Sequence, residues 1–180
     1  MNAYNEIEEA NKSALKMFYV LLFALVPLLF IVIIYLVDPQ SNVLKAISYN
    51  TRSLPAIMSS NSPLLSKSMD VYVKTSPFFA LFACCLTFKW IKLKSDKADK
   101  SAWQLLMLFV LFTLFYASLI YSFLFKNKEL ITSAKLLKLM STNDITLSFF
   151  YVTLYAGIYM FSCLYLWIGI GICRAIKERR

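Results

Sequence analysis

Long apolar runs alternate with polar segments along the chain. Residues 145–173 carry no charged side chain between Asp144 and Arg174, and residues 17–37 and 102–125 are two more uncharged runs. A helix needs about 20 mostly apolar residues to cross the ~30 Å hydrocarbon core of a bilayer. The pattern therefore predicts membrane-spanning helices at 17–37, 103–125 and 145–170.

A further apolar run is shorter. Only 14 uncharged residues separate Lys74 from Lys89, and at about 1.5 Å per residue they fall short of the core thickness. We therefore expect the helix to extend past Lys74 and to cover 71–91. Asp70 lies four residues before Lys74, which is the spacing of an ion pair on one helix face. The pair accommodates a lysine that extends toward the membrane surface, or it contacts a partner.

These runs predict an all-α, polytopic integral membrane protein with four transmembrane helices in an antiparallel bundle. A short amphipathic surface helix is predicted within 126–144, where Leu130, Ile131, Ala134 and Leu137 share one helical face. Val43, Leu44 and Ile47 are compatible with another. The remaining segments are the tail 1–16, the loop 38–70, the Lys-rich loop 92–102, the loop 126–144 and the basic tail 171–180.

The distribution of positive charge predicts the orientation. Segments 1–16, 89–101 and 174–180 carry 11 Lys and Arg in 36 residues, whereas 38–74 and 126–144 carry 8 in 56. Lys and Arg are enriched in cytoplasmic segments. Both termini are therefore predicted to be cytoplasmic, in a multi-pass protein of a bacterial inner membrane with 38–70 and 126–144 in the periplasm.

Candidate chemistry is sparse. The chain has no His and four Cys, all within or at the end of apolar runs, where Cys behaves as a small hydrophobic residue. No carboxylate lies in the middle of a span, where transporters usually need one. The sequence predicts no enzyme, no cofactor, no metal site and no nucleic-acid partner.

Residues that suit contact with another helix are easier to find. Small side chains let helices approach closely in a membrane. With the charged pair, they form the set of candidate partner-binding residues: Asp70, Lys74, Ala80, Ala83, Ala117, Ser118, Ala156 and Gly157.

Several short sequence motifs resemble those of one known family. They are Leu54–Ser60, Met69–Tyr72, Lys74–Pro77, Asn127 with Glu129–Thr132, Leu139–Asp144, and Thr146 to Tyr151. Together they resemble the immunity proteins of pore-forming colicins of the colicin A type. The similarity runs from about residue 17 to about residue 170 and includes the length and the four-span layout.

The resemblance implies a function. Such immunity proteins lie in the inner membrane of the producing bacterium and bind the pore-forming domain of the cognate colicin, whose hydrophobic hairpin inserts before the channel opens. The expected partners are that domain and membrane lipid, and the work is stoichiometric binding. A small transporter or channel subunit, or a structural partner in a larger membrane complex, is the alternative.

Overall fold

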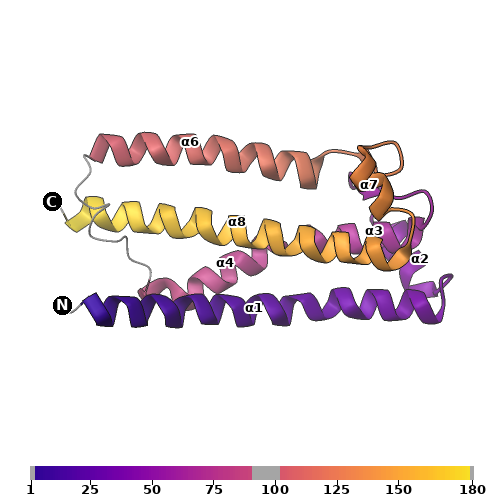
Figure 1. Cartoon of the computed structure of the whole chain (residues 1–180), viewed down its shortest axis with the longest axis horizontal. Helices are drawn as coiled ribbons and strands as arrows, with labels where there is room; N and C mark the ends of the chain where they lie inside the picture. The colour runs from indigo at the N-terminus through magenta and orange to yellow at the C-terminus, as the bar shows by residue number, and fades with distance from the viewer. Residues whose placement is uncertain (1–2, 91–101, 179–180) are drawn as a thin grey trace. The chain divides into compact units, whose positions relative to one another are not determined.

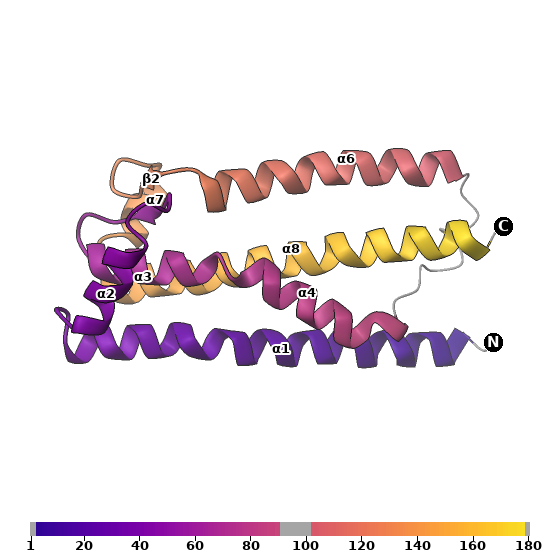
Figure 2. The ribbon, with the colours of Figure 1, turned by 180° about the vertical axis from the view of Figure 1, so that it is seen from behind.

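A computed structural model describes residues 3–90 and 102–178, and these residues are mostly helical (Figures 1 and 2). The long helices are α1 (Ala3–Val37), α6 (Ala102–Ile120) and α8 (Asp144–Glu178), and α6 is followed by the π-helical turn η2 (Tyr121–Phe125). Four helical stretches are long and apolar enough to cross a membrane: Asn11–Val37, Pro63–Thr87, Trp103–Phe125 and Asp144–Arg174. The prediction of four helices with this capacity is confirmed. The predicted Lys-rich loop 92–102 lies outside the described residues, apart from Ala102.

The second stretch differs from its prediction. It begins at Pro63, before position 71, and consists of two helices, α3 (Pro63–Val73) and α4 (Ser76–Thr87), followed by the 3₁₀ turn η1 (Phe88–Trp90). Pro77 explains the break, because it has no N–H to donate to the carbonyl of Val73. At this break, the N–H of Thr75 bonds the carbonyl of Tyr72, three residues earlier, at 2.9 Å.

The two predicted periplasmic loops contain short elements. In the first, α2 (Asn42–Asn50) buries Leu44 and leaves Val43 exposed, and Ser41 caps it by accepting the N–H of Val43 at 3.3 Å. Strand β1 (Ile57–Met58) then pairs in parallel with β2 (Lys128–Glu129) of the second loop, with Ile57 opposite Lys128.

The amphipathic helix predicted around 130–137 is wrong in its extent. Only α7 (Lys135–Met140) is helical there. Leu130 is buried beside the strand pair, where its N–H bonds the Met58 carbonyl at 2.9 Å. This long-range bond satisfies a backbone group that a local helix would otherwise use.

The chain divides into two compact units. Unit 1 contains Met1–Phe23, Pro77–Ser118 and Tyr159–Arg180, and unit 2 contains Ala24–Ser76 and Leu119–Ile158. Within unit 1, the first residues of α1 and α6 and the last residues of α8 lie at the same end (Figures 1 and 2).

Helix α8 contacts each of the other long helices that the structure describes in unit 1. Its Tyr159 hydroxyl donates to the Met17 carbonyl of α1 at 2.7 Å, and its Ser162 hydroxyl lies 2.8 Å from that of Tyr116 on α6. The Cys84 thiol of α4 donates to the Cys163 carbonyl of α8 at 3.8 Å. Helix α8, which the longest apolar run predicted, is therefore the helix that contacts α1, α4 and α6 within unit 1.

Candidate functional site

The charged residues of α3 form a buried cluster. Asp70 has no exposed surface, and it accepts an ion-paired hydrogen bond from the Lys74 amine and the Ile57 N–H at 3.2 Å. The Lys74 side chain is 17% exposed. The pair predicted from the spacing is formed, but Lys74 turns toward the carboxylate within unit 2.

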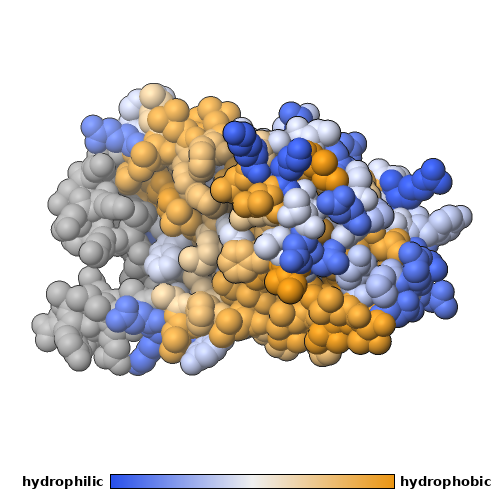
Figure 3. All heavy atoms as spheres, turned by 45° about the vertical axis from the view of Figure 1, so that its right-hand side comes forward, coloured by the Kyte–Doolittle hydropathy of each residue, from blue (hydrophilic) through white to orange (hydrophobic). Residues whose placement is uncertain are grey.

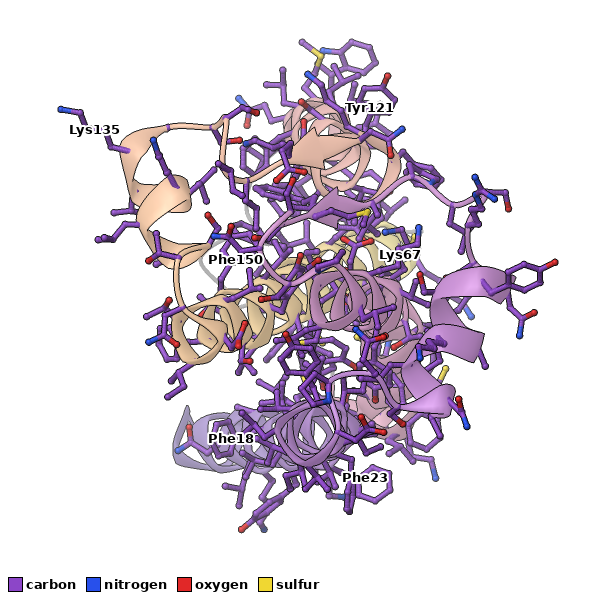
Figure 4. All side chains as sticks on the ribbon, turned by 90° about the vertical axis from the view of Figure 1, so that its right-hand side faces the viewer. Phe18, Phe23, Lys67, Tyr121, Lys135 and Phe150 are labelled. Carbon is purple, nitrogen blue, oxygen red and sulfur yellow. The ribbon has the colours of Figure 1, made fainter. Side chains whose placement is uncertain are left out.

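Lys67 is a third member of this cluster that the sequence analysis missed. It is buried, and its amine donates to the Leu54 carbonyl at 2.8 Å. Figure 4 shows Lys67 beside α3 within unit 2, whereas Lys135 on α7 points away from it. Lys67 and Lys74 lie three residues before and four residues after Asp70 on one helix face, a signal that was present in the sequence. The cluster fixes residues 54–57 to α3.

The first and second loops join in what we term the loop clasp, residues 56–62 with 127–130 and 141–144. The Asn127 side-chain oxygen accepts the Ala56 N–H at 2.8 Å, and the Lys128 N–H bonds the Ala56 carbonyl at 3.1 Å. The Glu129 carboxylate accepts the Ser60 N–H at 3.0 Å. These bonds satisfy backbone groups on either side of the two-residue strand pair.

The clasp is also anchored to the start of α8. The Asn61 amide donates to the Ser141 carbonyl at 3.0 Å, and the Ser62 hydroxyl bonds the Asp144 carboxylate. The buried Tyr151 hydroxyl donates to the Ile57 carbonyl at 2.6 Å. In Figure 3, polar residues gather over the loop-bearing end of unit 2 and apolar residues cover the flanks of its helices.

The predicted small residues fall into different environments. Ala80 and Ala83 are fully buried in unit 1, where the Cys163 thiol reaches the Ala80 carbonyl at 3.9 Å, so α4 lies close to α8 at this position. Ala117 and Ser118 are exposed on α6.

The last two small residues lie on α8. Ala156 and Gly157 are half-buried, and, apart from the adjacent residues and backbone of its own helix, a Cβ added to Gly157 would meet no described atom within 4 Å. Ala117, Ser118 and Gly157 are therefore the small residues beside which the structure leaves open space or an exposed surface.

Helix α6 presents the most exposed apolar surface. Only 6% of its most apolar window is buried, compared with 33% for α8. Trp103, Leu111 and Leu114 are each more than 60% exposed. In a membrane such a surface contacts lipid or the helices of another protein. Among the described residues, no group of three His, Cys, Asp or Glu could hold a metal ion.

Comparison with known proteins identifies the family. The family model described as colicin immunity protein matches residues 40–180. The chain is 36% identical over 180 residues to the colicin-A immunity protein of Citrobacter freundii, covering 100% of this chain and 99% of that protein. It is 32% identical over 149 residues to the colicin-B immunity protein of Escherichia coli, covering 82% and 83%. No solved structure matches the chain. The chain belongs to the colicin immunity protein family.

Proposed function

We propose that this protein protects its bacterium by binding the pore-forming domain of a cognate colicin in the inner membrane and keeping the channel closed. The family supports a protective role against a colicin. The observation that carries the intramembrane mechanism is the set of four apolar helical stretches of membrane length, of which Trp103–Phe125 has only 6% of its most apolar window buried. Most of the surface available for recognition then lies within the bilayer.

Recognition in lipid depends on packing and interhelical hydrogen bonds, because hydrocarbon surrounds free and bound helices alike. We assign the principal contact to α6 at Ala117 and Ser118, where small side chains permit a close approach and a hydroxyl is exposed. We assign an indirect role to the other candidates: Ala80 and Ala83 are buried where α4 lies close to α8 in unit 1, and the Asp70–Lys74 pair stabilises α3 in unit 2.

A chimeric toxin tests the mechanism. A colicin that joins the cognate pore-forming domain to foreign receptor-binding and translocation domains should be neutralised by cells that express this chain. A nuclease colicin that enters through the same receptor should kill those cells. Resistance to the nuclease colicin would show that the protein blocks uptake, and the intramembrane mechanism would be wrong.

Variants of α6 test the contact. We expect A117L/S118L to reduce the protective titre against the cognate colicin by about tenfold or more, equivalent to about 1.4 kcal/mol of lost affinity. L108F is the matched control, since Leu108 is an exposed residue of the same helix with no small side chain to lose. Membrane levels are measured by immunoblot. Full protection by A117L/S118L at normal levels would exclude this contact.

A further inference from the structure

Unit 1 contains an apolar groove that the proposed function does not use. It has a volume of about 530 Å³ and is bounded by η1, α6 and the last turns of α8, with Phe88, Phe109, Tyr165 and Gly169 in its lining. Small-molecule sites in proteins commonly occupy about 300–1,000 Å³. Its lining residues on α8 lie between Tyr165 and Lys177, in the last turns of that helix, and α6 begins at the same end of unit 1 (Figure 1).

Gly169 determines the width of the groove. A Cβ built at Gly169 would lie 3.3 Å from Cε2 of Phe109 and 3.4 Å from its Cζ. The Phe109 ring therefore lies directly against the backbone of α8. A larger side chain at position 169 would push this ring aside and take up volume within the groove.

Two cations stand at the rim of this apolar space. Arg174 and Lys177 line the groove from α8, and the described residues that line it include no carboxylate. The Arg174 guanidinium donates to the Phe88 carbonyl at 2.7 Å and lies 4.5 Å from the centroid of the Phe88 ring. These contacts hold the positive charge of Arg174 at a fixed position beside the apolar groove.

We propose that this groove binds one anionic phospholipid, with an acyl chain along Phe109 and Gly169 and the phosphate at Arg174 and Lys177. Arg and Lys pair strongly with phosphate oxygens. Basic pockets between membrane helices on the cytoplasmic side suit anionic headgroups, and the predicted topology places this end of α8 there. An apolar helix of a partner would need no cation, and a free phosphate ion would leave the apolar lining unused.

Native mass spectrometry of the detergent-solubilised chain tests the site. Phosphatidylglycerol and phosphatidylcholine with the same acyl chains are the probes. We expect the wild type to retain phosphatidylglycerol preferentially. R174Q/K177Q should lower that adduct by about tenfold, since each surface cation contributes a several-fold preference for anionic lipid, and should leave the phosphatidylcholine adduct unchanged. K45Q/K135Q, which removes two exposed lysines from unit 2, should match the wild type.

G169L provides a second variant that keeps every charge. It should also lose the phosphatidylglycerol adduct, because the acyl chain has less room. Equal retention of the two lipids by the wild type, or an equal loss in K45Q/K135Q, would overturn the proposal. So would competition by glycerol 3-phosphate at the concentration of the lipid, which would show that the headgroup alone binds. Loss of colicin protection in R174Q/K177Q with unchanged lipid adducts would assign the groove to the toxin and would also overturn it.

Discussion

Asp70 shows how one residue joins local and distant structure. Its carboxylate is fully buried and accepts from Lys74 on its own helix and from the Ile57 N–H thirteen residues earlier. The sequence could predict the first contact, because it depends only on helical spacing. The contacts of Asp70 with Ile57 and of Lys67 with Leu54 depend on the path of an irregular segment, which no periodic pattern encodes.

We predict that K74A lowers the free energy of unfolding by about 3–5 kcal/mol, because the Asp70 carboxylate then stays buried without its counter-charge. D70N/K74M should recover most of that loss, since Asn keeps an oxygen for the Ile57 N–H and neither charge remains. Unfolding in mixed micelles by SDS titration measures both variants, with K45A on exposed α2 as the control. If K74A is as stable as K45A but fails to protect cells, the pair contacts the toxin instead.

At the scale of elements, several of the motifs that resemble the colicin immunity family lie close together in space. Leu54–Ser60, Glu129–Thr132 and Leu139–Asp144 are far apart along the chain, yet all contribute to the loop clasp or border it. Their residues bond backbone groups of each other's segments. We infer that these motifs determine how the two loops join and so position the helices that follow the loops.

The clasp yields a test at Asn127. N127A should lower the free energy of unfolding by about 1–3 kcal/mol, the usual effect of leaving a buried donor unpaired, here the Ala56 N–H at 2.8 Å. N127D keeps the accepting oxygen and should stay near the wild type. Limited proteolysis of both loops in spheroplasts reports the opening of the clasp. Equal cleavage of N127A and the wild type would mean that the strand pair holds the loops without this side chain.

The sequence predicts elements well where hydrophobicity decides them. Residues 145–170 form a continuous helix within α8, and 17–37 and 103–125 likewise lie in helices. Prediction fails where a distant segment or a missing donor intervenes, as with Leu130 in the strand pair and with the break before Pro77. The tyrosines at 151, 155 and 159 are buried on α8. The sequence analysis missed them, because a tyrosine within an apolar run does not indicate whether its side chain is buried or exposed.

At the scale of the whole molecule, function depends on how the helices cross the membrane. A colicin pore domain arrives from the periplasm in the proposed mechanism, and the predicted topology places the two loops of the clasp on that side. Charge supports this orientation, because 11 of the 19 Lys and Arg lie in the three segments predicted to be cytoplasmic. The positive-inside tendency acts on short flanking segments such as these.

Reporter fusions test the orientation. We expect a fluorescent reporter to be active after residue 16, within 89–101 and at the C-terminus, and alkaline phosphatase to be active when inserted after Arg52 or Thr132. Arg52 and Thr132 are exposed. The Thr132 hydroxyl donates to the Glu129 carbonyl within its own loop at 3.3 Å, whereas the bonds described above between the two loops are made by other residues, so insertion at either position leaves those bonds in place. Replacing Lys92, Lys94 and Lys97 with Gln serves as the charge control and should lower the fraction of correctly oriented molecules, because the positive charge that holds this loop inside is reduced. Alkaline phosphatase activity from the 89–101 fusion in the otherwise unchanged chain would contradict the predicted orientation. The loops of the clasp would then lie on the side of the membrane that an incoming colicin does not reach.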